Sequence, residues 1–308
     1  GLDRIDASVD GLDALVKAQM RSITFENFEP LLGIVPDLAP AAVWRKLVSD
    51  RRGGYCMELN TLLGAALDAT GFVKRPFLGR VRMGAPTGGP RSHYAWVVTV
   101  DGREFLVDSG FGGPGAHGIV PLAAVGTEHS SGGRRFRLRA DAATGELVLE
   151  RQEAEGWFSL YGFDPFPVTA ADIETANFVC ARWEKSPFPA HLMMSRHRNE
   201  GRAAMFDASL TLETPAGVEK RALGSADEFA AVLDGVFGLR IDRGTAEAAG
   251  ARGGGAVPRA GKGGGAPPPR GGLAAASGPR PRTAPRYSPA RSGRSSPTTG
   301  SSAGRAWS

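Results

Sequence analysis

Apolar residues in the first 70 positions recur every three or four residues, which is the spacing of one helix face. One such stripe covers residues 9–20, and Ser8 precedes it as a favourable N-cap. A second covers residues 43–48 after Pro40, which suits a first helical turn. A third begins at Cys56 and can end at Gly71. The beginning of the chain is therefore predicted to be helical.

From about Phe72 the pattern changes to short runs rich in β-branched and aromatic residues. The clearest runs are residues 94–100 and 103–107, and Asp101-Gly102 between them is typical of a two-residue hairpin turn. Further short runs of this kind cover residues 135–138, 146–150 and 157–161. The middle of the chain is therefore predicted to be a β-rich segment.

Beyond Thr169 the signals are mixed, apart from an amphipathic helix predicted over residues 225–236. Residues 243–308 differ in kind, because they contain 15 Gly and 9 Pro, and Val257 and Leu273 are their only large aliphatic residues. Such a segment cannot bury enough apolar surface to offset the entropy lost on ordering. We predict that this tail is disordered. Its abrupt onset also suggests the hypothesis that it is a foreign C-terminus, for example a frameshift product.

The net charge of +5 is distributed unevenly along the chain. The tail contains 11 basic residues and one acid, whereas residues 1–242 contain 26 basic and 31 acidic residues. The basic character therefore belongs to the tail, which could make salt-sensitive contacts with acidic surfaces. The body of the protein has no polyanion-binding composition, and nucleic acid is not an expected partner.

Several other classes of protein are not expected. No run of 18 apolar residues occurs, and the first residues contain acids and no apolar core of a secretion signal. The chain has two cysteines, Cys56 and Cys180, with no CxxC motif or Cys/His cluster. We therefore expect free thiols, no structural metal site and a cytoplasmic location. The sequence does not indicate an oligomeric state.

Cys56 is the first candidate for chemistry. Gly53-Gly54 allow a tight turn, after which Cys56 falls in the first turn of the predicted helix. The unpaired N–H groups there favour a thiolate, and Arg52 adds a positive charge nearby. Taken alone, this position is weak evidence for a nucleophile, because a free cysteine is commonly a small buried apolar side chain, and we expect Cys180 to be structural.

The hairpin supplies partners for a nucleophilic thiol. A two-residue turn at Asp101-Gly102 places Val100 opposite Arg103, which brings His93 and Asp108 to one sheet face as diagonal neighbours. The carboxylate could then orient the imidazole and leave its other nitrogen for Cys56. A strand-end histidine and a turn-capping aspartate are the structural alternatives.

With these residues in view, the sequence resembles the arylamine N-acetyltransferases over roughly residues 3–242. The resemblance is carried by several blocks in order: Phe25-Glu26-Asn27-Phe28, Arg52-Gly53-Gly54-Tyr55-Cys56 with Glu58 and Asn60, Leu106 to Gly112, Ser186-Pro187-Phe188 and Phe237-Gly238-Leu239. It implies an α+β fold with a core similar to cysteine proteases and transglutaminases. The implied parts are a helical domain over 1–80, a β-barrel domain over 81–168 and an α/β lid over 169–242, followed by the tail over 243–308.

The resemblance also implies roles for individual residues. Cys56 would accept the acetyl group, His93 would be its base and Asp108 would orient the imidazole. Arg52 and Glu58 would support the active-site loop and helix. The acceptor and coenzyme A pocket would be lined by Phe25, Gly110, Phe111, Gly112, Gly113 and Phe188. The substrates would be acetyl-CoA and an arylamine or arylhydrazine, with no metal.

Three other functions stay open at this stage. The same triad could close a macrolactam from a polyketide thioester, as in an amide synthase. It could also serve a cysteine protease or transglutaminase. A third alternative is a binding protein without catalytic activity, whose basic tail contacts nucleic acid.

Overall fold

The structure is a computed structural model that describes residues 5–113, 115–123, 125–199, 201–242 and 244–246. The described residues belong to one compact unit. The predicted disordered tail lies outside them, apart from residues 244–246. No helix in the described ranges is long and apolar enough to cross a membrane.

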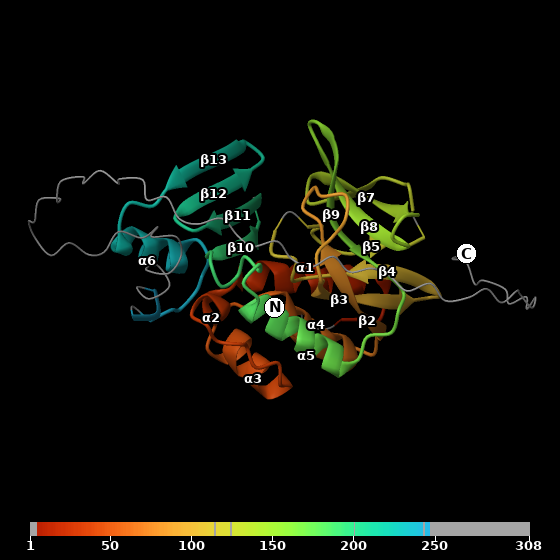
Figure 1. Ribbon diagram of the computed structural model, residues 1–308, viewed down its shortest axis with the longest axis horizontal. Coiled ribbons are helices and arrows are strands. Elements are labelled where there is room, and N and C mark those ends of the chain that lie inside the picture. The colour runs from red at the N-terminus through yellow and green to blue at the C-terminus, as the bar shows by residue number, and fades with distance from the viewer. Residues whose placement is uncertain (1–4, 114, 124, 200, 243, 247–308) are drawn as a thin grey trace, which may run out of the picture. The chain divides into compact units, whose positions relative to one another are not determined.

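The N-terminal part is helical, as the spacing of its apolar residues predicts (Figure 1). Its elements are α1 (Val9–Ser22), α2 (Phe28–Leu31), α3 (Pro40–Trp44), a π-helical turn η1 (Arg45–Ser49) and α4 (Cys56–Ala69). Ser8 caps α1 by accepting a hydrogen bond from the backbone of Gly11 at 3.1 Å. Pro40 occupies the start of α3, and Gly71 has φ 79° just beyond α4.

The middle of the chain forms an eight-stranded antiparallel sheet that curves into a nearly closed barrel. Its strands are β2 (Val73–Val81), β3 (Arg91–Val100), β4 (Arg103–Val107), β5 (Val120–Pro121), β6 (His129–Ser131), β7 (Arg134–Asp141), β8 (Glu146–Glu153) and β9 (Gly156–Phe163). Strand β3 is buried on both faces, because one face lines the barrel and the other packs against α4. This explains why residues 94–100 are almost continuously apolar.

A second antiparallel sheet pairs the N-terminal strand β1 (Phe25–Glu26) with four later strands in the order β1-β10-β11-β12-β13. These strands are β10 (Met193–Arg198), β11 (Gly201–Phe206), β12 (Ser209–Thr214) and β13 (Gly217–Ala222). Helix α6 (Ala226–Gly235) contributes Phe229, Val232 and Leu233 to the core of this sheet. The pairing of β1 with β10 attaches the sheet to the helical part.

Helix α5 (Ala170–Arg182) is one of the elements that the apolar pattern did not predict. It lies within the range assigned to the lid, but it packs against β3 and α2. Its Ala176 and Cys180 belong to the same core as α1 and α4. Together with the fold seen in related structures, these elements confirm the α+β class expected from the sequence.

Candidate active site

Cys56 is the first residue of α4, as the sequence predicts. Tyr55 before it is extended (φ −97°, ψ −171°), so the chain turns directly into the helix at the cysteine. The carboxylate of Glu58 accepts a hydrogen bond from the backbone N–H of Tyr55 at 3.2 Å, which stabilises this first turn. The thiol is free, and Cys56 is 4% exposed.

The hairpin has the predicted register. Val100 pairs with Arg103, and the pairing continues to Trp96 with Val107. Asp101 and Gly102 have φ values of 50° and 73°, the positive values that a type I′ turn requires. His93 and Asp108 therefore project to the same side, and His93 Nε2 lies 2.6 Å from Asp108 Oδ2.

Asp108 is surrounded by hydrogen-bond donors. Its Oδ1 accepts from the Gly110 backbone at 2.8 Å and from Asn60 Nδ2 at 3.1 Å. Its Oδ2 accepts from the Tyr161 hydroxyl at 3.0 Å, in addition to its contact with His93. Burial alone would raise the pKa of Asp108, but His93 and these donors outweigh it and hold the pKa below its usual value. Asp108 is thus a buried, fully charged carboxylate.

His93 is held between this carboxylate and two aromatic rings, those of Tyr161 at 4.7 Å and Phe111 at 5.0 Å. Burial by itself lowers the pKa of His93. The charge of Asp108 and the hydrogen bonds to Asp108 and Cys56 outweigh it and raise the pKa from 6.5 to about 10. Since Nε2 faces Asp108, Nδ1 is the nitrogen left for the thiol of Cys56. The imidazole is therefore an orientated and strengthened base.

The thiol of Cys56 differs from the sequence-based expectation of a readily formed thiolate. The neighbouring Cys180 thiol and burial both raise its pKa, whereas contact with His93 lowers it, and the net direction is upward. Ionisation of Cys56 therefore depends on His93.

Arg52 and Glu58 lie in a second buried ionic cluster beneath the start of α4. Glu58 pairs with Lys46 Nζ at 2.6 Å, and the same Nζ lies 3.0 Å from Glu29. Arg52 points to Glu26, 3.4 Å away, and not to Cys56. Burial raises the pKa of Glu58 to about 7, although the charge of Lys46 opposes the shift. Both residues adjoin the active-site loop and helix, and their supporting role stays a prediction.

The predicted pocket residues line one cavity together with Cys56 and His93. It has a volume of about 370 Å³ and is lined by all six of them: Phe25, Gly110, Phe111, Gly112, Gly113 and Phe188. Two of these glycines are required by close approach. A Cβ on Gly110 would lie 2.8 Å from Cys56 Cα, and one on Gly112 (φ 70°) would lie 2.4 Å from the Phe25 ring.

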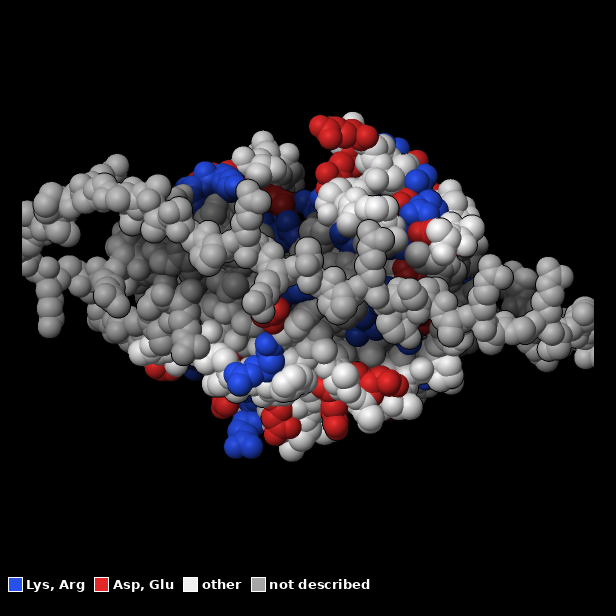
Figure 2. Space-filling model, in the orientation of Figure 1, with Lys and Arg blue, Asp and Glu red and all other residues white. Residues whose placement is uncertain are grey.

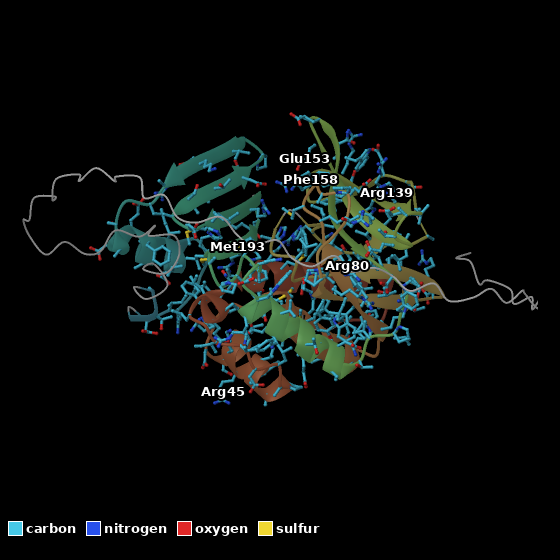
Figure 3. All side chains as sticks on the ribbon, viewed as in Figure 1. Arg45, Arg80, Arg139, Glu153, Phe158 and Met193 are labelled. Carbon is cyan, nitrogen blue, oxygen red and sulfur yellow. The ribbon has the colours of Figure 1, made fainter. Side chains whose placement is uncertain are left out.

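Most of the remaining cavity wall is apolar. Met193, labelled in Figure 3, lines it from the start of β10, and Trp183 lines it from the residue after α5. Lys185 also lines it and brings a positive charge. A flat aromatic molecule would fit such a surface, because apolar walls with few polar groups are typical of small-molecule sites.

Several site residues were not assigned from the sequence alone. Asn60 follows Cys56 by four residues, so that helical periodicity could have placed it on the same face of α4. Tyr161 and Lys46 reach the site from distant elements, and no local pattern marks them. Cys180, expected to be structural, lines the cavity beside Cys56.

Within the described ranges, no group of three or more His, Cys, Asp or Glu side chains is arranged to hold a metal ion. On the face drawn in Figure 2, the described Lys and Arg side chains are interspersed with Asp and Glu and do not form one continuous patch.

Comparisons with known proteins agree with this geometry. Residues 8–246 match the N-acetyltransferase family. The arylamine N-acetyltransferase / N-hydroxyarylamine O-acetyltransferase of Salmonella typhimurium is 36% identical over 195 residues, or 63% of this chain and 68% of that protein. The arylamine N-acetyltransferase of Escherichia coli is 32% identical over 238 residues, or 76% of this chain and 84% of that protein.

A solved structure of the Mycobacterium marinum arylamine N-acetyltransferase in complex with CoA superposes with a TM-score of 0.75 at 31% identity. The match covers 80% of this chain and 94% of that one. With a matching sequence, the same fold and a thiol, an imidazole and a carboxylate brought together, the chain belongs to the arylamine N-acetyltransferase family.

Proposed function

We propose that this protein transfers an acetyl group from acetyl-CoA to an arylamine or arylhydrazine through an acetyl-Cys56 intermediate. The observation that carries the proposal is the buried contact of 2.6 Å between His93 and Asp108, beside a free thiol at the start of a helix. Family membership supports the reaction class, and the relative solved with CoA supports the donor.

In the first half-reaction, His93 takes the proton of Cys56 and the sulfur attacks the thioester carbonyl. Asp108 holds the resulting imidazolium, because its own charge is maintained by three further donors, Asn60, Gly110 and Tyr161. The unpaired N–H groups in the first turn of α4 are suited to stabilise the negative charge that develops on the carbonyl oxygen. Coenzyme A leaves as a thiol, taking a proton from His93.

In the second half-reaction, the amine attacks the acetyl carbonyl on Cys56 and His93 receives the proton that the amine loses. An aromatic amine is neutral near pH 7, so it needs no deprotonation before the attack. The aromatic and aliphatic walls of the cavity, among them Phe25, Phe188 and Met193, would hold its ring. Sulfur is regenerated as the leaving group, and the thiol is restored.

The direct test is mass spectrometry of the full chain after exposure to acetyl-CoA without an acceptor. We expect one acetyl group per chain, located on the peptide that contains Cys56. It should disappear when an arylamine is added, with release of the acetylated amine. The Cys56→Ser variant is the matched control and should show no adduct and a loss of turnover of at least about 10⁴-fold.

Other outcomes would redirect the proposal. Acylation of Cys56 only by a long acyl chain that carries its own amine would favour an amide synthase. Hydrolysis of a peptide, or its cross-linking through lysine, would favour the protease or transglutaminase alternative. An acetyl adduct on any residue other than Cys56 would overturn the assignment of the nucleophile.

A further inference from the structure

The two cysteines of the chain come together at a single backbone carbonyl. They are 124 residues apart in the sequence, and no other cysteine is present. Yet the Sγ of Cys180 lies 3.1 Å from the carbonyl oxygen of Ser92, and the Sγ of Cys56 lies 3.9 Å from the same oxygen. The two sulfur atoms therefore cannot be farther apart than the sum of these distances.

The elements that carry the two thiols are well anchored. Cys56 begins α4 and Cys180 lies in α5, and both helices pack against β3, the strand that contains Ser92. Asn177, one turn before Cys180, accepts a hydrogen bond from the Tyr55 hydroxyl through its backbone carbonyl at 3.2 Å. The residues that precede the two cysteines are thus linked directly. This contact fixes α5 against the start of α4.

Small molecules from solvent can reach both sulfur atoms. Each cysteine is only 4% exposed, but both line the cavity of about 370 Å³ that we assign to the substrates. Much of its wall is apolar, and its lining includes Val179, Trp183 and Phe188 together with the two cysteines. A small uncharged oxidant such as hydrogen peroxide would therefore meet Cys56 and Cys180 in the same space.

We propose that Cys56 and Cys180 form a reversible disulfide when a hydroperoxide oxidises the active-site thiol. The proposal rests on the proposed function in one respect, namely that His93 ionises Cys56. Cys180 is then a resolving thiol, which protects the nucleophile from irreversible oxidation and switches the enzyme off until a reductant restores it.

The chemistry balances in two steps. The Cys56 thiolate attacks one oxygen of hydrogen peroxide, the O–O bond breaks, and a sulfenic acid forms while the leaving hydroxide takes a proton from His93 and becomes water. The sulfur of Cys180 then attacks the sulfur of Cys56. The S–O bond breaks, and hydroxide leaves with the proton of Cys180 as a second water. Two thiols are oxidised by two electrons, and one peroxide is reduced to two waters.

The test uses the full chain treated with hydrogen peroxide in small molar excess, then denatured and alkylated without reductant. We expect peptide mapping to find the Cys56 peptide joined to the Cys180 peptide, with a loss of two hydrogens. Free thiols should fall from two to none per chain. Dithiothreitol should restore both thiols and the thiol reactivity of Cys56 nearly completely.

Two single-cysteine variants are the matched controls. In Cys180→Ser, Cys56 has no resolving partner, so we expect it to proceed to sulfinic and sulfonic acids that dithiothreitol does not reverse. In Cys56→Ser, the thiol that interacts with His93 is removed, and we expect Cys180 to keep its free thiol at the peroxide dose that converts the wild type. Bound acetyl on Cys56 should protect the wild type from the cross-link.

Three results would overturn the proposal: wild-type Cys56 oxidised beyond sulfenic acid without a joined peptide, a disulfide between two chains, or a Cys180→Ser variant that recovers as fully as the wild type. None of these readouts requires acetyl transfer. If the disulfide forms but the protein has no acetyltransferase activity, only the proposed function is contradicted. If the enzyme is active but the disulfide does not form, only this inference is contradicted.

Discussion

Two buried carboxylates, those of Asp108 and Glu58, lie near the start of α4, and their environments shift their pKa values in opposite directions. Asp108 is 8% exposed and Glu58 1%, so burial disfavours the charge of each. The pKa of Asp108 is nevertheless lowered, whereas burial raises that of Glu58 to about 7. The difference comes from their partners and not from their depth.

Each carboxylate oxygen of Asp108 has two hydrogen-bond partners, and one of the four partners is an imidazole that can become positive. Glu58 shares the single ammonium of Lys46 with Glu29, and the charge of Glu26 acts on both Glu58 and Lys46. A carboxylate with more donors than it needs keeps its charge, and one that competes for a cation takes up a proton. The first is suited to catalysis, and the second to holding a helix start in place.

The largest effect is expected when the charge of Asp108 is removed. In Asp108→Asn the amide cannot accept from the imidazolium, and His93 loses the charge that raises its pKa. We expect kcat/KM to fall by about 10³–10⁴-fold with the fold retained, as for the equivalent change in other triads. Steady-state kinetics with acetyl-CoA and an arylamine measure kcat/KM, and circular dichroism measures whether the fold is retained.

Asp141→Asn is the control for that variant, because Asp141 also pairs with a buried cation, Arg82 at 2.7 Å, but outside the triad. It should change stability and leave kcat/KM within a few-fold. If the two variants lose activity equally, the special position of Asp108 is not supported.

A smaller effect, on stability and not on rate, is expected at Glu58. Its pKa is raised from 4.5 to about 7, so the folded protein holds a proton that the unfolded chain releases. The contribution of this proton to the free energy of unfolding is complete below about pH 4.5 and is lost as the pH rises through about 7. The loss over this window is roughly 3 kcal/mol. The stability of Glu58→Gln should not decrease in this way, because glutamine does not titrate.

Calorimetric Tm values of the wild type and Glu58→Gln between pH 4.5 and 8 test this. Titrating groups that both proteins share contribute equally to the two Tm values and cancel in their difference. The Tm of Glu58→Gln minus that of the wild type should therefore increase as the pH rises. For Asp108→Asn the sign is reversed, because a lowered pKa stabilises above the unfolded value and is lost toward acid pH. Parallel Tm curves for the wild type and Glu58→Gln would contradict the contrast between the two carboxylates.

The donors of Asp108 allow a finer test. Tyr161→Phe removes one of the hydrogen bonds to Oδ2 and leaves the others in place. Loss of a hydrogen bond to a buried charge costs about 1–3 kcal/mol, so we expect a decrease in kcat/KM well below that of Asp108→Asn. The acid limb of the pH–rate profile should move to higher pH, because Asp108 is less stabilised in its charged form.

Tyr94→Phe is the matched control, since Tyr94 is also buried but its hydroxyl makes no hydrogen bond to the triad in the described structure. It should leave the acid limb in place. An equal shift in both variants would mean that the loss of a buried hydroxyl, and not the contact with Asp108, is the cause.

These contrasts also separate what the sequence predicts from what it does not. The hairpin register followed from Asp101-Gly102, because a two-residue turn determines every pair beyond it. The position of Cys56 followed from two glycines and an amphipathic stripe. Both are local signals: the turn was sufficient to bring His93 and Asp108 together, and the glycines with the stripe were sufficient to place Cys56 at a helix start.

The partners of these residues come from far along the chain, and local patterns do not specify them. Thr169 and Asp172 form a capping box that could have predicted α5, but nothing in that segment predicts that Cys180 meets Cys56. Strand β13 is exposed along its whole length, so it lacks the alternation that identifies a half-buried strand. The opposite pKa shifts of Asp108 and Glu58 likewise arise only after folding.

The smallest expected effect concerns Cys180, which is a buried neighbour of Cys56, the proposed nucleophile. Its S–H donates to the carbonyl of Ser92 at 3.1 Å, and its side chain also contacts the thiol of Cys56. That contact favours the protonated form and raises the pKa of Cys56.

In Cys180→Ala this contact is absent, while burial still raises the pKa of Cys56 and His93 still lowers it. We therefore expect the pH dependence of Cys56 alkylation by iodoacetamide to move to lower pH. Cys180→Ser keeps an acceptor oxygen and should move it less. A shift to higher pH in the alanine variant would mean that Cys180 donates to the thiolate, so that it would act on Cys56 as the donors act on Asp108.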